Sequence, residues 1–165
     1  MEKKIHKILA CVDLSEYSFI TLEHALEFAR STESEVVILN VINQRDITGL
    51  EMGVAYFPGY FVENIDTEEY INGVRNERHE KLKKFINDNF ANEKSITQIK
   101  IDLGIPSECI LKTVETDHID LIVMANKGRG NLSRFLFGSV AEKVFRHSPI
   151  PVVSVRDKKA FKRTK

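Results

Sequence analysis

Short apolar segments alternate with helical patterns along the chain, and this alternation restricts the possible folds more than any other feature. Residues 8–12 and 36–42 are apolar almost throughout, as expected of strands buried on both faces of a parallel sheet. Residues 120–125 and 151–155 have the same character, whereas 96–103 alternates apolar and polar residues and suits a half-exposed edge strand. The resulting order, β-α-β-α-β-α-β-α-β, predicts an open α/β fold with a five-stranded parallel sheet and helices on both faces.

The helical segments differ in how clearly the spacing of their apolar residues shows a helical period. Apolar residues recur every three or four positions after Ser15, which can cap the first helix, and again over residues 67–90. Residues 43–66 lack a clean period and contain glycines, a proline and four aromatic residues. We therefore expect a long irregular excursion there, of the kind that often covers a ligand or a partner.

Composition narrows the class of protein. The 165 residues carry 24 Lys plus Arg and 24 Asp plus Glu, so the net charge is zero and no specific nucleic-acid partner is expected. No apolar run approaches the ~20 residues of a membrane helix, so we expect a cytoplasmic protein without a membrane partner. Cys11 and Cys109 lack metal-binding spacing, and no metal site is predicted. We expect a single domain over residues 1–156 and a basic C-terminal tail over 157–165.

Ligands of open α/β sheets bind at the carboxyl ends of the strands, so the residues that follow each strand are the candidates for a site. Asp13 follows the first strand, a glycine-containing loop over 126–131 follows the fourth, and Gly138-Ser139 opens the last helix. Glycines let backbone N–H groups approach an anion, and the unpaired N–H groups at a helix start favour negative charge. Because the loop is neither a Walker A loop nor a dinucleotide-binding GxGxxG turn, spacing alone leaves two alternatives, a phosphate cradle and an ordinary glycine-rich connection.

The same region resembles the C-terminal signature of the universal stress protein (UspA-like) family, whose pattern is G-x2-G-x9-G-S/T. Gly128 is followed by nine residues and then by Gly138-Ser139, and residues 138–144 and 147–152 are also similar to the family. Ala125 stands where the pattern has its first glycine. The similarity extends over the chain, with family positions at Val12-Asp13, Asn40-Val41 and Gly104-Ile105-Pro106.

This resemblance implies a Rossmann-like sheet of strand order 3-2-1-4-5 and, in the nucleotide-binding branch, a bound ATP or other adenine nucleotide, with or without Mg²⁺. It implies that Asp13 lies near the adenine or ribose and that Val41 contacts the base through its backbone. The other residues implied in binding, the last five of them around ribose and phosphates, are Val12, Ala125, Asn126, Gly128, Arg129, Gly138, Ser139 and Val140. The methyl group of Ala125 would crowd a ligand that lies close to it.

Ordinary structural roles remain open for several of these residues. Asp13 is equally suited to capping the first helix, and one residue can do both. Lys127 and Arg129 are either solvated loop charges or cations beside a triphosphate. The sequence brings together no nucleophile and base and no carboxylate pair, so no catalytic residue is predicted.

The sequence thus favours a nucleotide-binding stress-response or regulatory module over an enzyme. The alternatives are a dimeric interaction protein that does not bind nucleotide and a slow ATP hydrolase. Because residues 151–155 form the outer strand of the implied order, we expect a homodimer through the Pro151–Val155 edge. A proline cannot donate to such a ladder, and Val153, at the centre of this strand, is where we expect one to disturb the pairing.

Overall fold

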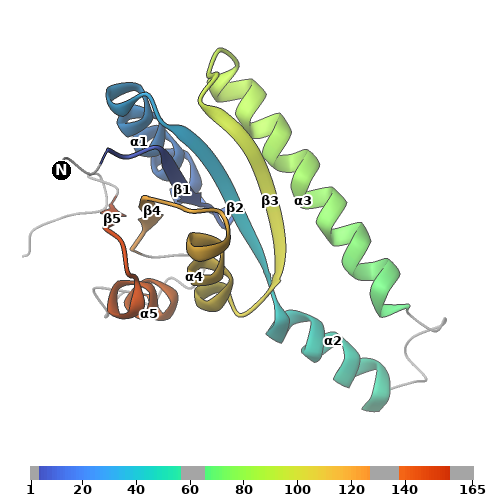
Figure 1. Cartoon of the computed structure of the whole chain (residues 1–165). Coiled ribbons are helices and arrows are strands. Elements are labelled where there is room, and N and C mark those ends of the chain that lie inside the picture. The colour runs from blue at the N-terminus through green and yellow to red at the C-terminus, as the bar shows by residue number, and fades with distance from the viewer. Residues whose placement is uncertain (1–3, 57–65, 127–137, 157–165) are drawn as a thin grey trace, which may run out of the picture.

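The computed structural model of the chain describes residues 4–56, 66–126 and 138–156 (Figure 1). In chain order its elements are β1 (Lys7–Cys11), α1 (Tyr17–Thr32), β2 (Glu35–Asn43), α2 (Gln44–Tyr56), α3 (Thr67–Phe90), β3 (Ile96–Gly104), α4 (Pro106–Thr116), β4 (Leu121–Ala125), α5 (Ser139–His147) and β5 (Val152–Val155). Among these residues, no helix combines the length and the apolar character needed to cross a membrane.

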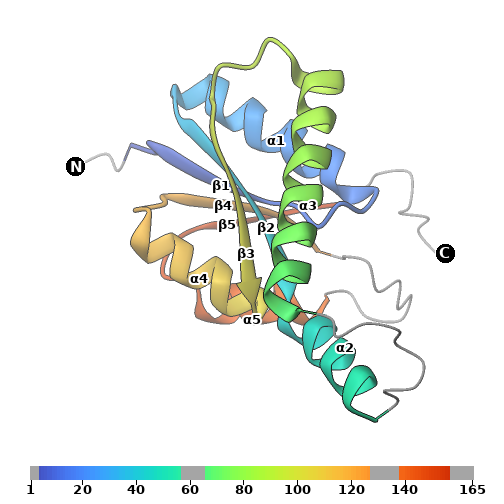
Figure 2. The same ribbon diagram turned by 90° about the vertical axis from the view of Figure 1, so that its right-hand side faces the viewer.

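The five strands form one parallel sheet with the order β3-β2-β1-β4-β5, so the implied fold class and strand order are confirmed (Figure 2). β1 lies at the centre, where Leu9 is in register with Val37 of β2 and with Ile122 of β4. The chain adds β2 and β3 on one side of β1 and then β4 and β5 on the other. The strand order therefore reverses between β1 and β4, which is where ligands of such sheets bind.

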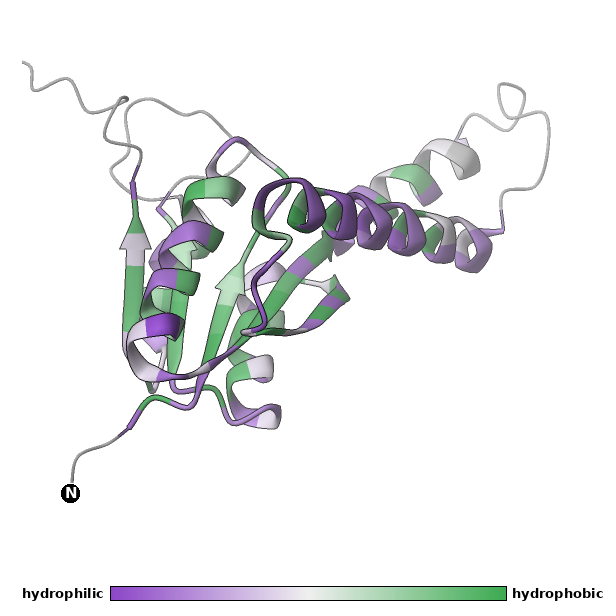
Figure 3. Cartoon of the chain, turned by 90° about the horizontal axis from the view of Figure 1, so that it is seen from above, coloured by the Kyte–Doolittle hydropathy of each residue, from purple (hydrophilic) through white to green (hydrophobic). Residues whose placement is uncertain are grey.

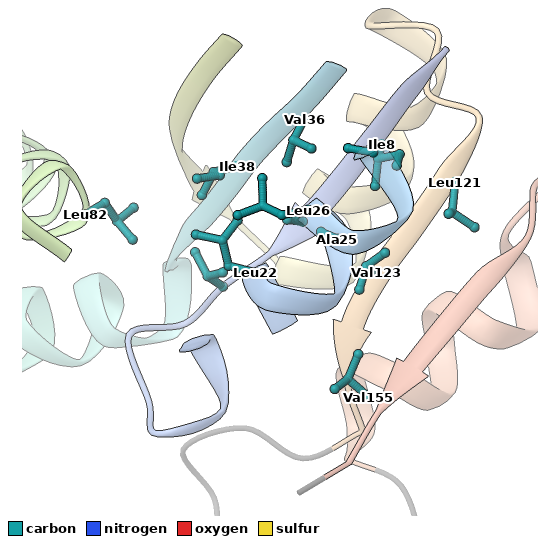
Figure 4. Packing of buried hydrophobic residues seen from close by; sticks show 13 residues of the cluster. Ile8, Leu22, Ala25, Leu26, Val36, Ile38, Leu82, Leu121, Val123 and Val155 are labelled. Carbon is teal, nitrogen blue, oxygen red and sulfur yellow. The ribbon is translucent and has the colours of Figure 1, made fainter. Parts of the chain in front are cut away.

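Helices cover both faces of the sheet. Successive strand residues point to opposite faces, so Ile8 and Ala10 pack with α1 and α3, whereas Leu9 packs with α4 and α5. Leu22 and Leu26 of α1 are almost fully buried against the first face (Figure 4). The strands β1, β2 and β4 read as continuous apolar runs because both of their faces are covered in this way.

The segment after β2 differs from the sequence expectation. The prediction of an irregular excursion over 43–66 is wrong for its first part, because Gln44–Tyr56 form α2, while residues 57–65 lie outside the described residues. Together with the start of α3, α2 projects beyond the sheet (Figures 1 and 3). Ile47 is buried, whereas Met52 and Tyr56 are exposed. Gly49 and Gly53 are poor helix formers, and they make this segment look like a loop in the sequence even though Ile47 and Leu50 have helical spacing.

A largely buried ion pair ties the edge strand β3 to the end of α4. Lys100 Nζ lies 2.8 Å from Asp117 Oδ2, and both side chains are about four-fifths buried, with exposed fractions of 21% and 18%. Burial alone would raise the pKa of the Asp117 carboxyl. Hydrogen bonds from Lys100 and Thr116 outweigh that effect and hold this pKa below its ordinary value.

We expect Lys100→Met to lower the free energy of unfolding by about 1 kcal/mol at neutral pH. The folded state holds the Asp117 pKa down, so the pair stabilises above the unfolded-state pKa of about 4, and this contribution is lost as pH falls through the folded pKa. Urea unfolding of both proteins between about pH 3 and pH 7 measures this, with the exposed Lys94→Met as control. A deficit that stays constant across this range would contradict the assignment.

Candidate functional site

The candidate site lies where the strand order reverses, at the carboxyl ends of β1 and β4. Val12 and Asp13 follow β1, while Ala125 ends β4 and is followed by the buried Asn126. The backbone N–H of Gly138 donates to the Asn126 carbonyl at 2.8 Å, which brings the start of α5 to the same edge. The structure thus places these five predicted residues on neighbouring elements. The predicted residues Gly128 and Arg129 lie outside the described residues.

The start of α5 can receive an anion. Gly138 is its N-cap residue, with φ −74° and ψ 156°, and the first helical hydrogen bond runs from Glu142 N to the Gly138 carbonyl at 2.9 Å. The N–H groups of residues 139–141 therefore have no acceptor within the helix. Among the described residues, no side chain caps this end. Ser139 is exposed and Val140 half-buried, so the helix start is open to solvent, as an anion site requires.

Asp13 has a local role in the structure. Its Oδ1 accepts hydrogen bonds from the Ser15 N–H at 3.0 Å and from the Ser18 hydroxyl at 3.4 Å. These bonds hold the turn between β1 and α1, in which Leu14 has a φ of 62°. The N-cap position of α1 is Glu16, one residue beyond the predicted cap Ser15. Asp13 is half-buried beside the carboxyl end of β1, and its contact with a ligand stays a prediction.

Val41 lies in the part of β2 that extends past the end of β1. The Leu39 carbonyl accepts a hydrogen bond from Val12 N at 2.9 Å. Because carbonyls along a strand alternate in direction, the Val41 carbonyl points to the same side, beyond the end of β1. This is the position from which the Val41 backbone can meet a ligand at the reversal point.

Two side chains that the sequence analysis did not assign to the site join this edge to α3. Arg78 Nη1 donates to Asn40 Oδ1 and to the Val41 carbonyl, each at 3.0 Å. Asn40 Nδ2 in turn donates to the Val12 carbonyl at 2.8 Å, and Asn40 is 1% exposed. A signal for Arg78 was present in the sequence, because it occupies a position four residues from Val74 and from Leu82 on the inner face of α3. A basic residue on the inner face of a helix is a candidate for contact with acceptors of the strands beneath it.

Ala125 replaces a glycine of the family pattern without strain. The described non-glycine residues with positive φ are Leu14, Glu33 and His118, so Ala125 has an ordinary strand backbone. It is in register with Val155 of β5 and half-buried. Its methyl group therefore affects the space at the edge and leaves the backbone undisturbed.

Around this edge, the described residues offer neither a reactive thiol nor a set of metal ligands. Cys11 packs against the core beneath α4 and α5, and burial raises the pKa of its thiol to about 12, so it is not a nucleophile at neutral pH. In the described part of the chain, no three His, Cys, Asp or Glu side chains group as metal ligands. A hollow of about 370 Å³ opens elsewhere, between α1 and β5, and holds none of the predicted site residues.

The parallel sheet has one reversal of strand order, so the protein is an open α/β protein. Its candidate ligand edge lies at the carboxyl ends of β1 and β4, beside the start of α5. Residues 4–156 match the model of the universal stress protein family. The chain belongs to the universal stress protein family.

Relatives of the chain cover its length. Universal stress protein MJ0577 of Methanocaldococcus jannaschii is 35% identical over 161 residues, which span 92% of this chain and 95% of the relative. The solved structure of MJ0577 superposes with a TM-score of 0.75 at 30% identity, covering 94% of this chain and 98% of that one. YxiE of Bacillus subtilis is 29% identical over 153 residues, or 92% and 99% of the two chains. A universal stress protein solved in complex with cAMP has a TM-score of 0.53 at 18% identity, and the match covers 93% of this chain and 98% of that one.

Proposed function

We propose that this protein binds an adenine nucleotide, ATP or AMP, where β1, β4 and the start of α5 meet, and that it acts as a stress-response or regulatory module. The observation that carries the proposal is the hydrogen bond from Gly138 N to the Asn126 carbonyl, which holds the open helix start against the reversal point. The cAMP complex of another universal stress protein supports it, because that protein shares this fold and accommodates an adenine nucleotide.

Different residues of the candidate site suit the phosphates, the ribose and the base of an adenine nucleotide. The N–H groups of Ser139 and Val140 would hold phosphate oxygens, because they have no acceptor within the helix and lie at the positive end of its dipole. Asp13 and the Val41 backbone would lie toward the ribose and base, on the β1 and β2 side of the reversal. Gly128 and Arg129 would complete the ribose and phosphate contacts. Mg²⁺, where present, would be held mainly by the phosphates, since the described residues offer no cluster of carboxylates.

The purified protein tests this proposal without any added ligand. The chain has no tryptophan, so its own absorbance is low and co-purified nucleotide should give an excess at 260 nm. We expect the nucleotide released by denaturation to be an adenine nucleotide by chromatography. If the released material is absent and added ATP does not bind, the protein is instead an interaction module without nucleotide.

We expect ATP turnover by the pure protein to stay far below the ordinary ~1–10³ s⁻¹ of enzymes. At the candidate edge, Asp13 already accepts hydrogen bonds from Ser15 and Ser18, and the Cys11 thiol is protonated. Neither side chain is therefore placed to act as a base that activates water. Release of phosphate under single-turnover and steady-state conditions measures the rate. Sustained turnover within the enzyme range would favour the hydrolase alternative.

We expect Ala125→Gly to bind ATP with equal or higher affinity, because it removes a methyl group at the edge without a change of backbone region. Glycine in a strand should also lower stability by about 0.5–1 kcal/mol. Calorimetric titration gives the affinity and thermal unfolding the stability. Clearly weaker binding by the folded variant would mean that the methyl group is itself part of the pocket.

We propose further that the protein is a homodimer through β5. This strand is a sheet edge, paired with β4 on one side only, and it is mostly apolar. The hollow between α1 and β5 lies beside it, with Phe28 at 37% exposure in its lining. An apolar edge of this kind is an aggregation hazard unless it is covered, and a two-fold axis covers both copies at once.

A further inference from the structure

One side chain of α3 controls the backbone at the end of β2. Arg78 is half-buried, and its Nη1 atom lies 3.0 Å from both Asn40 Oδ1 and the Val41 carbonyl. Through Asn40, whose Nδ2 lies 2.8 Å from the Val12 carbonyl, the same guanidinium is connected to the end of β1. Arg78 thus joins α3 to two adjacent strands at the candidate ligand edge.

Two contacts set the orientation of the Asn40 amide, and Arg78 supplies one of them. Its nitrogen faces a carbonyl acceptor and its oxygen faces a guanidinium donor, so a flipped amide would oppose oxygen to oxygen and N–H to N–H. Asn40 is 1% exposed, so water cannot readily replace a lost partner. Arg78 and the Val12 carbonyl therefore hold the Asn40 amide between them.

The Val41 carbonyl is the part of this network that a ligand would meet. It points past the end of β1, and a carbonyl oxygen has two lone pairs, so one bond to Arg78 leaves an acceptor direction open. A carbonyl held in place accepts a hydrogen bond from a ligand that brings a donor, and it repels a ligand that brings an acceptor. A carbonyl free to turn away would discriminate less, because the wrong ligand could avoid the repulsion.

We propose that Arg78 is a positioning residue that makes the site select 6-amino over 6-oxo purines, by holding the Val41 carbonyl toward the base. This inference rests on the proposed nucleotide-binding function and adds the basis of its base selectivity. The amino group of adenine donates to a fixed carbonyl, whereas the 6-oxo group of inosine or guanine places a second acceptor against it.

The test compares ATP, ITP and inorganic tripolyphosphate in calorimetric titrations of the wild type and Arg78→Met. We expect the wild type to prefer ATP over ITP. In Arg78→Met we expect ATP to bind about tenfold more weakly, while ITP and tripolyphosphate change little, so that the ATP-to-ITP preference falls. Arg75→Met is the matched control, because Arg75 lies one turn away and bonds to Asn72 of its own helix at 3.3 Å.

Arg78→Lys is a second, more conservative variant that keeps the test possible if Arg78→Met does not fold. Lysine keeps the charge but lacks the planar fork, so we expect an intermediate preference for ATP. Equal weakening of ATP and ITP would show a purely structural role, and tighter ATP binding would show that Arg78 obstructs the base. Either result, or a wild type that binds ATP and ITP equally, overturns this inference alone. A wild type that binds neither nucleotide overturns the proposed function together with it.

Discussion

Gly138→Asp should abolish measurable ATP binding and leave the fold intact. The φ of −74° at Gly138 is accessible to any residue, and aspartate is a favoured N-cap residue, so the variant should be as stable as the wild type or slightly more so. The new carboxylate would accept a hydrogen bond from the Val140 N–H, which the proposal assigns to phosphate, and its charge would repel the phosphates from the whole helix start. Losing two charge-assisted hydrogen bonds of about 1.5–3 kcal/mol each weakens affinity roughly hundredfold or more.

The matched control is Gly138→Asn, which caps the helix with a neutral side chain of the same size. We expect it to weaken ATP binding less than aspartate does, because it competes for the amides without like-charge repulsion. Calorimetric titration and thermal unfolding of the three proteins separate the effects. Unchanged affinity in a folded Gly138→Asp protein would remove the helix start from the site.

The second large effect is on assembly, where Ser154→Pro should convert the homodimer into a monomer. The carbonyls of Pro151 and Val155 accept hydrogen bonds from Ile122 N and Asn126 N of β4, at 3.1 and 3.2 Å. Because backbone groups alternate along a strand, the Ser154 N–H points to the open edge. Proline removes that donor and leaves the β4–β5 ladder in place. Light scattering at micromolar concentration measures the change.

The same geometry corrects the choice of Val153 as the probe. Val153 alternates in phase with Pro151 and Val155, so its N–H faces β4, and a proline there would break the sheet itself. Ser154→Ala is the control for Ser154→Pro, since it keeps the N–H and removes a buried hydroxyl that has no hydrogen-bond partner among the described residues. A native chain that is monomeric, or a Ser154→Pro chain that remains dimeric, would contradict the β5 interface.

The fold was predictable because its three inner strands, β1, β2 and β4, are buried on both faces. Strands such as Val36–Leu39 leave no alternative to a covered parallel sheet, and the family resemblance supplied the strand order. The helix α2 was not predictable by the same argument. Ile47 and Leu50 have helical spacing, but Gly49 and Gly53 lie among them, and glycine is a poor helix former that indicates a loop.

The candidate site was predictable where it depends on strand ends and missed where it depends on long-range contacts. Ala125 ends β4, and Val12, Asp13 and Asn126 follow strands, so the sheet alone brings these residues together. The contact of Arg78 with Val41 spans 37 residues of sequence, and local spacing cannot show which acceptor a helix side chain will meet. The direction of each N–H in β5 likewise follows from the pairing register, which the sequence does not state.

We propose that an adenine nucleotide binds at the edge formed by β1, β2, β4 and the start of α5. Backbone amide chemical shifts, mapped during titration with ATP, locate the bound nucleotide. We expect saturable shifts at Val12, Asp13, Val41, Ser139 and Val140, and little change along the outer face of α3. Shifts confined to the hollow between α1 and β5, or no saturable shifts at all, would contradict the claim.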